Sequence, residues 1–152
     1  MTNFEQTIKY LKNKFITLDT NIFLLLVIGS YNISHVKKFK RTNTFTENDY
    51  YLLLKLIKSS QIILTPNIIT EASNLLESYH EEKIKIGLIA LKKIIKSFEE
   101  KFEYSDILSE MDSFLKFGLT DSSINRLCRS GVIAITVDLP LFGFLSSQSL
   151  LS

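Results

Sequence analysis

The chain has 152 residues, 45% of them hydrophobic, and a mean hydropathy of +0.14, which argues against intrinsic disorder. Its formal net charge of +2 does not by itself demand a polyanionic ligand. A single cysteine, Cys128, rules out an internal disulfide, and no apolar run approaches the roughly 20 residues of a membrane span. The N-terminus lacks the basic start and apolar stretch of a signal peptide, so we expect one cytoplasmic domain over residues 1–152, with no membrane partner.

The expected secondary structure alternates between helices and short apolar strands. In chain order, we expect a helix at residues 4–12, a strand at 15–18, a helix at 22–28, a loop at 30–46, a helix from 46, a strand at 61–65, a helix from 66, a helix at 81–98, a strand at 101–104, helices at 106–117 and 121–130, a strand at 132–136, a helix at 139–145 and a tail at 146–152. Local signals support these boundaries: Gly29 and Gly131 close helices, Thr46 is an N-cap, and Pro66 suits a first helical turn.

Strands that alternate with helices and are apolar throughout are typical of a parallel sheet that is covered on both faces. We therefore expect an α/β fold, a three-layer α/β/α sandwich around a central parallel sheet. No internal repeat, low-complexity segment or domain linker interrupts the pattern.

Four acidic residues stand at the ends of these expected elements. Asp19, Glu71 and Asp138 each follow a strand or lie early in the helix after it, and Asp121 begins a helix. The carboxyl ends of parallel strands share one edge, where ligands bind. Four carboxylates that meet there would repel one another unless a cation neutralises them, and Mg²⁺ or Mn²⁺ prefers such oxygen ligands. The simpler interpretation of any one of these acids alone is a helix cap or a helix-dipole acid.

Four short motifs occur in an order that resembles the PIN domain family. They are Leu18-Asp-Thr-Asn-Ile22, Thr65-Pro-Asn-Ile-Ile-Thr-Glu-Ala72, Leu119-Thr-Asp-Ser122 and Ile135-Thr-Val-Asp138. The resemblance covers about residues 15–145. It implies that Asp19, Glu71, Asp121 and Asp138 are metal-binding catalytic acids. It further implies that Asn21 orients the first carboxylate and that Thr136 is a supporting hydroxyl.

Many PIN domains are Mg²⁺- or Mn²⁺-dependent ribonucleases, and many of the bacterial ones are toxins that an antitoxin holds silent. The resemblance therefore implies an endoribonuclease that leaves 5′-phosphate and 3′-hydroxyl ends. It implies the strand order 3-2-1-4, with a possible fifth strand. Its implied partners are an RNA substrate and an antitoxin or other protein.

The chain departs from the family pattern at two places. Val137 stands where relatives often carry a second acid beside the last one, which predicts weak binding of a second metal ion. Only residues 149–152 could supply the fifth strand, so we expect an open edge beside the fourth strand that favours a homodimer or another partner.

Basic residues predict where RNA would be held. A cluster after the first buried helix is expected near the mouth of the site, and it consists of Lys37, Lys38, Lys40 and Arg41. Arg126 follows Asp121 on one helix and could reach a phosphate. A solvated surface is the alternative interpretation for both.

Two other function classes stay open at this point. The departure at Val137 and the apolar composition are compatible with a non-catalytic PIN-like module that binds RNA or protein. A DNA nuclease of the flap-endonuclease type is the third option, although the chain is short for the DNA-clamping elements of those enzymes.

Overall fold

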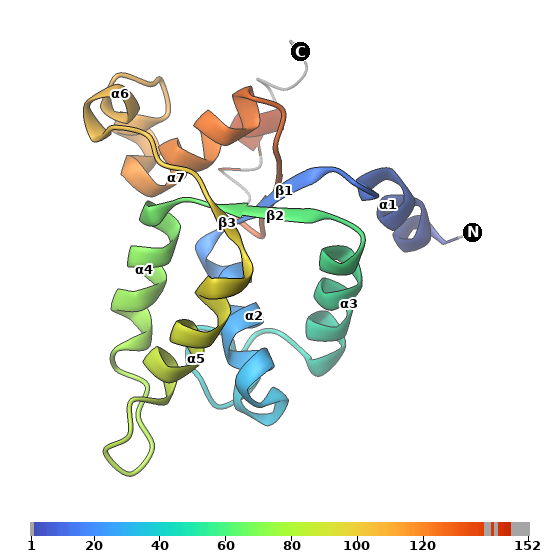
Figure 1. The fold of residues 1–152 in the computed structure, drawn as a ribbon, viewed down its shortest axis with the longest axis vertical. Helices are drawn as coiled ribbons and strands as arrows, with labels where there is room; N and C mark the ends of the chain where they lie inside the picture. Colours follow the sequence, from blue (N-terminus) through green and yellow to red (C-terminus); the bar gives the residue numbers. More distant parts are fainter. Residues whose placement is uncertain (1, 139–140, 142, 147–152) are drawn as a thin grey trace.

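A computed structural model describes residues 2–138, 141 and 143–146 (Figure 1). In chain order its elements are α1 (Asn3–Leu11), β1 (Phe15–Leu18), α2 (Thr20–Tyr31), η1 (Ile33–Val36), α3 (Glu47–Lys58), β2 (Gln61–Leu64), α4 (Pro66–Leu76), α5 (Ile86–Ile94), η2 (Ile95–Ser97), β3 (Glu99–Glu100), α6 (Ser105–Ser109), α7 (Phe114–Arg129) and β4 (Ile133–Ile135). Residues 141 and 143–146 are also helical. Among the described residues, no helix is both long and apolar enough to cross a lipid bilayer.

The four strands form one parallel sheet in the order β3-β2-β1-β4, which confirms the predicted α/β class and the order of these four strands. The central strand β1 pairs with both neighbours, with Ile16 opposite Ile62 in β2 and Ile133 in β4. Residues 149–152, which the prediction considered for a fifth strand, lie outside the described part of the chain.

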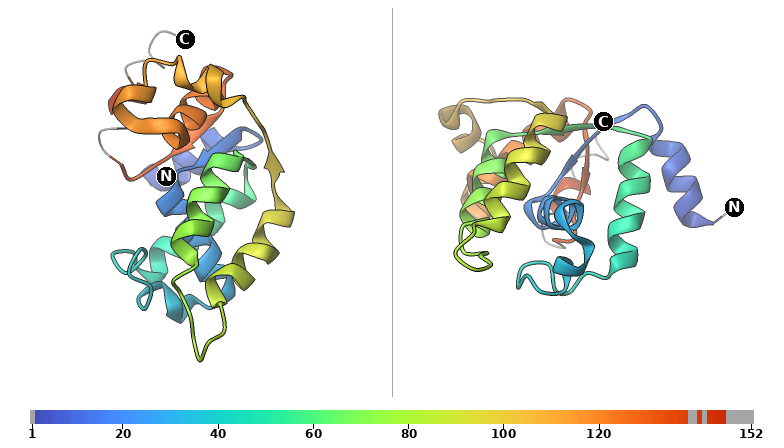
Figure 2. Two further views of the ribbon diagram at one scale, coloured as in Figure 1. Left: turned by 90° about the vertical axis from the view of Figure 1, so that its left-hand side faces the viewer. Right: turned by 60° about the horizontal axis from the view of Figure 1, so that its bottom comes forward.

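Helices cover both faces of the sheet. Ile62 and Leu64 of β2 belong to a large core cluster that also contains α2, whereas Ile63 between them packs with Leu127 of α7. Alternate residues of a strand point to opposite faces, so α2 and α7 lie on different sides. Figure 1 shows α2, α3, α4 and α5 below the strands and α7 above them, and Figure 2 shows the same layers from two other directions.

The helix α2 is the centre of the larger layer. It is apolar on all sides, and its residues from Ile22 to Gly29 are all buried. A helix that is hydrophobic all round has to be enclosed, and α3, α4 and α5 each contact it. Burial of one such Leu or Ile side chain contributes about 1.5–3 kcal/mol. This packing holds the N-terminal end of α2 firmly against the carboxyl end of β1.

Several predicted boundaries are wrong. The helix expected at residues 81–98 is replaced by α5 and the short η2 that follows it. The helix α5 starts late because Glu82 and Lys83 adopt positive φ angles in a turn closed by Glu81 and Ile84. The third strand lies at residues 99–100 rather than 101–104. The first buried helix does not end at Gly29 but continues to Tyr31.

The remaining differences are smaller. The loop at residues 30–46 contains the short helix η1, and the helix expected at 106–117 is divided between α6 and the start of α7. The break expected near residue 119 is a kink inside α7, where Gly118 has φ 86° and ψ −171°. Of the helix expected at 139–145, residues 139–140 and 142 lie outside the described residues, as do 147–152 of the expected tail.

A glycine permits the close approach of α4 and α5. A Cβ atom at Gly87 would lie 2.5 Å from the backbone oxygen of Leu76. We therefore expect Gly87→Ala to push the two helices apart and to lower the free energy of unfolding by about 1–3 kcal/mol. Urea unfolding checks this. Gly143→Ala is the control, because no described atom lies within 4 Å of its Cβ position. Equal stability of the two variants would contradict the packing argument.

Candidate functional site

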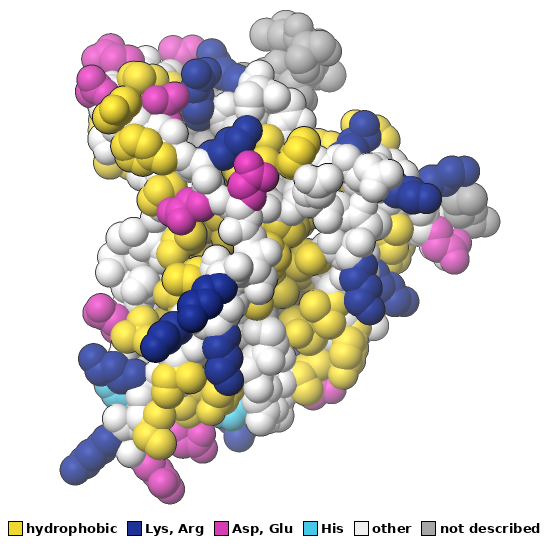
Figure 3. Space-filling view, viewed as in Figure 1, with side chains coloured by type: hydrophobic (Ala, Val, Ile, Leu, Met, Phe, Trp, Pro, Cys, Tyr) yellow, Lys and Arg dark blue, Asp and Glu magenta, His cyan; other side chains and the backbone are white. Residues whose placement is uncertain are grey.

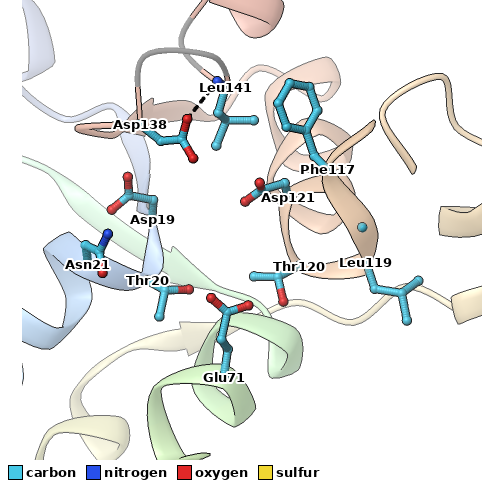
Figure 4. A pocket seen from close by; sticks show the side chains of 11 residues that line it. Asp19, Thr20, Asn21, Glu71, Phe117, Leu119, Thr120, Asp121, Asp138 and Leu141 are labelled. Atoms are coloured by element: carbon cyan, nitrogen blue, oxygen red, sulfur yellow. Dashed lines mark hydrogen bonds between the residues drawn. The ribbon is translucent and has the colours of Figure 1, made fainter. Parts of the chain in front are cut away.

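A pocket of about 350 Å³ opens at the carboxyl ends of β1 and β4, and all four predicted acids line it (Figure 4). They come from four separate segments: Asp19 follows β1, Glu71 lies in α4, Asp121 lies in α7 and Asp138 follows β4. The rest of the lining is Thr20, Asn21, Phe117, Gly118, Leu119, Thr120 and Leu141. Residues up to 119 positions apart in the sequence thus share one mouth.

Asp19 is the most firmly held of the acids. It is the N-cap of α2, and its Oδ1 accepts a hydrogen bond of 2.9 Å from the backbone N–H of Ile22. Its Oδ2 accepts a bond from the Thr136 hydroxyl and another, of 3.1 Å, from the backbone N–H of Val137. The residue is only 5% exposed. Both carboxylate oxygens are therefore fixed by the protein backbone and by one hydroxyl.

The hydroxyl of Thr136, for which the sequence predicts a supporting role, connects Asp19 to Asp138. Its hydroxyl donates to Asp19 and accepts a 2.9 Å hydrogen bond from the backbone N–H of Asp138. The Oδ1 of Asp138 accepts a 3.0 Å bond from the N–H of Leu141. The other oxygen of Asp138 points into the pocket in Figure 4. One short segment after β4 thus orients two of the four acids.

Asp121 faces Asp19 and Asp138 from the opposite wall (Figure 4). Its carboxyl is partly buried, and its pKa is raised to about 6 from an ordinary value of 3.8. Burial is the largest cause of this increase, followed by the negative charges of Asp138, Glu71 and Asp19, in that order. The four acids therefore interact electrostatically, as the sequence argument expects.

Buried hydroxyl groups fix α4 and α7 relative to each other. Thr65, the N-cap of α4, accepts a hydrogen bond from the N–H of Ile68, and its hydroxyl also bonds to that of Ser123 in α7 at 2.8 Å. Within α7, a second buried bond of 2.9 Å joins the hydroxyl of Ser122 to that of the N-cap residue Ser113 and so holds the two parts of the kinked helix together. These contacts position Glu71 and Asp121, and the sequence analysis did not find them. Small hydroxyl residues beside each acid motif were the available signal.

Asn21 does not have the predicted orienting role. It lies on the rim of the pocket, and no hydrogen bond joins it to Asp19 in the described part of the chain. The N–H groups of Ile22 and Val137 and the hydroxyl of Thr136 orient Asp19 instead. Helix capping explains this outcome, since an N-cap carboxylate naturally accepts from the backbone of the first turn.

The basic loop lies away from the pocket, contrary to expectation. It holds the four residues Lys37, Lys38, Lys40 and Arg41. It follows the C-terminal end of α2, whereas Asp19 caps the N-terminal end, and a helix of that length spans about 18 Å. In Figure 1 this loop lies at the bottom of the molecule, far from the ends of the strands. Arg126 is also outside the pocket, where it forms a 3.2 Å ion pair with Glu103.

The donor set fits a hard divalent cation in its chemistry. Four carboxylates and the hydroxyls of Thr20 and Thr120 supply only oxygen ligands. Within the described ranges, no three acidic, histidine or cysteine side chains lie close enough together to hold one ion directly. Mg²⁺ does not require three, because it commonly keeps several waters and uses one or two carboxylates. Asp19, Asp121 and Asp138 are the candidates, of which one or two would bind the ion directly and the rest through bound water.

Comparison with family models, with curated proteins and with solved structures found no match to this chain. The geometry of the pocket is therefore the evidence for function.

The titration of Asp121 tests the electrostatics of the site. In metal-free protein the pKa of this carboxyl is about 6, above the ordinary value of 3.8, so the folded state binds more protons than the unfolded state between these values. Stability should therefore fall as the pH rises through this window. Asp121→Asn should reduce that fall, which urea unfolding in EDTA at pH 4 and pH 7 measures.

A second variant separates the neighbouring charges from burial. Asp138→Asn removes the charge with the largest effect on Asp121, so it should lower the pKa of Asp121. Carbon-detected NMR of the carboxyl groups would follow that pKa directly. An unchanged pKa would mean that the two carboxyls do not interact in solution.

Proposed function

We propose that this chain is a PIN-like, metal-dependent endoribonuclease that hydrolyses phosphodiester bonds of RNA. The observation that carries the proposal is the meeting of Asp19, Glu71, Asp121 and Asp138 around one pocket at the carboxyl edge of a parallel sheet. Burial and the charges of the other three acids raise the pKa of Asp121, and such a cluster is costly without a cation, which favours a metal-dependent role.

Asp19, Asp121 and Asp138 would hold Mg²⁺ or Mn²⁺, and Glu71 would complete the site or position the attacking water. When bound, the ion would supply positive charge that activates water and stabilises in-line displacement at phosphorus. The hydrogen bonds to Asp19 hold its carboxylate in one orientation before any ligand enters. The Thr20 hydroxyl lines the same pocket and can donate to a phosphate oxygen.

The proposal extends to the biological setting. In a bacterial toxin-type system, a protein antitoxin would hold the activity silent, and the chain would act as a homodimer. The cleavage assay below depends on neither of these.

Cleavage of RNA is the direct test. Purified protein with Mn²⁺ or Mg²⁺ should cut a labelled RNA and leave 5′-phosphate and 3′-hydroxyl ends. Asp19→Asn removes one negative charge from the centre of the site, so it should lower the rate by about 100-fold or more. Gel analysis of the products measures both the rate and the ends.

The matched control is Asp112→Asn, because Asp112 is exposed and does not line the pocket. It should cut RNA at the rate of the unaltered chain. If Asp19→Asn left the cleavage rate unchanged, the assignment of this pocket as the active site would be refuted. If the protein cut duplex DNA in preference to RNA, a DNA nuclease would be favoured.

A non-catalytic PIN-like module is the second candidate, and one observation favours it. No three acids in the described residues lie within the reach of one ion, although four line the pocket. Such a module would bind RNA or protein and would have no measurable affinity for Mn²⁺. Titration calorimetry with Mn²⁺ therefore separates the two candidates without any assumption about the RNA.

The same titration tests the part that Thr136 plays. Its hydroxyl orients Asp19 and touches the backbone of Asp138, so Thr136→Val should weaken Mn²⁺ binding by about 10- to 100-fold. Thr136→Ser keeps the hydroxyl and should bind nearly as well as the unaltered chain. If the Val and Ser variants lost affinity equally, the hydroxyl would have no part in the site.

A further inference from the structure

A second pocket, of about 410 Å³, lies directly beside the acid pocket. The two pockets share Glu71, Leu119 and Thr120, so a ligand in one can continue into the other. The rest of the second pocket comes from α4 and from the segment around the start of α6, and it consists of Pro66, Asn67, Thr70, Asn74, Phe102, Glu103 and Ser105.

The α4 wall of this pocket is a stripe of polar side chains. Asn67, Thr70, Glu71 and Asn74 follow helical spacing and lie on one face of α4, whereas Ala72 on the opposite face is buried. Asn67, Thr70 and Asn74 form no side-chain hydrogen bond within the described residues, so their groups are available. Amides and hydroxyls both donate and accept, as the edges of nucleobases also do.

An exposed aromatic ring forms the other wall. Phe102 has 67% of its surface exposed, and Tyr104 meets it edge to face with ring centres 5.1 Å apart. Figure 3 shows hydrophobic side chains gathered at the surface around α6, at the upper left. A large aromatic ring that stays in water beside a polar pocket is suited to stacking with a base.

Cationic groups lie beyond Phe102. A third pocket, of about 200 Å³, shares Phe102 and Glu103 with the second and adds Lys101 and Arg126. Arg126 neutralises Glu103, and no ion pair involves Lys101 in the described residues. A path along the surface therefore runs from the acids to uncharged hydrogen-bonding groups, then to an aromatic ring, and then to a cation.

We propose that the second pocket binds one unpaired nucleobase of a single-stranded RNA. The base stacks on Phe102, its edge contacts the polar stripe of α4, and the next phosphate along the strand lies near Lys101. The inference rests on the proposed function, because the adjoining scissile phosphate would occupy the acid pocket. Bases within a duplex are paired and stacked, so they cannot enter the pocket.

Binding without cleavage tests this inference. Fluorescence anisotropy of a labelled 12-nucleotide single-stranded RNA would be measured with Asp19→Asn protein, and circular dichroism would verify the fold. Adding Phe102→Ala should weaken binding by about 5- to 150-fold, the range for loss of one stacked base. Phe102→Trp should restore it. Tyr10→Ala is the matched control, since Tyr10 is 63% exposed in α1 and should not affect binding.

Abasic substitutions in the RNA make the test specific. An abasic nucleotide at the position that the pocket holds should weaken binding as much as Phe102→Ala, and the two changes together should cost little more than either alone. A duplex of the same sequence should bind more weakly and should not respond to Phe102→Ala. The proposal would be overturned if Phe102→Ala left the affinity for single-stranded RNA unchanged. It would also be overturned if the losses of affinity from Phe102→Ala and from the abasic nucleotide were additive.

A failure of the proposed base pocket can be told apart from a failure of the proposed nuclease function. If Asp19→Asn abolished cleavage but Phe102→Ala left RNA binding intact, only the proposed base pocket would be wrong. Binding that depends on Phe102 in a chain that never cuts RNA would support the pocket and refute the nuclease. Binding of a basic peptide in preference to RNA would assign the surface to a protein partner and overturn the inference.

Discussion

The hydrogen bonds that Asp19 accepts from the segment after β4 are the contact on which the rest of the site depends. They join the ends of two neighbouring strands, because Asp19 follows β1 while Thr136 and Val137 follow β4. The burial of α2 fixes one side of this contact, and the sheet fixes the other. The same Thr136 hydroxyl that donates to Asp19 also accepts a hydrogen bond from the backbone N–H of Asp138, and so it positions Asp138.

The opposite wall is positioned by different means. Among the described residues, no hydrogen bond joins Glu71 or Asp121 to Asp19, and their helices are instead joined by the buried bond between the hydroxyls of Thr65 and Ser123. Buried polar groups require such partners, so this bond specifies how α4 and α7 sit. In this arrangement burial and the neighbouring negative charges raise the pKa of Asp121, which is a cost to stability near neutral pH. A site that carries such a cost is a better candidate for function than for structure.

The sheet and the four acids could be predicted from sequence because both follow from local patterns. Apolar strands that alternate with helices specify a parallel sheet, and its carboxyl edge gathers the residues that follow each strand. The predicted position of the basic loop was wrong although the sequence contained the signal, because the loop follows the C-terminal end of the helix whose N-terminal end carries Asp19. The turn at Glu82 and Lys83 was also not predicted, since left-handed backbone at such residues has no clear sequence signal.

Val137 contributes to the pocket through its main chain. Its side chain is exposed at 51%, at the position where the resemblance to PIN domains predicts a missing acid. Its backbone N–H, however, donates to Oδ2 of Asp19, and any residue other than proline supplies that donor. The position therefore contributes to Asp19 through the main chain. The valine side chain is not among the residues that line the pocket, so the negative charge of the pocket comes from Asp19, Glu71, Asp121 and Asp138.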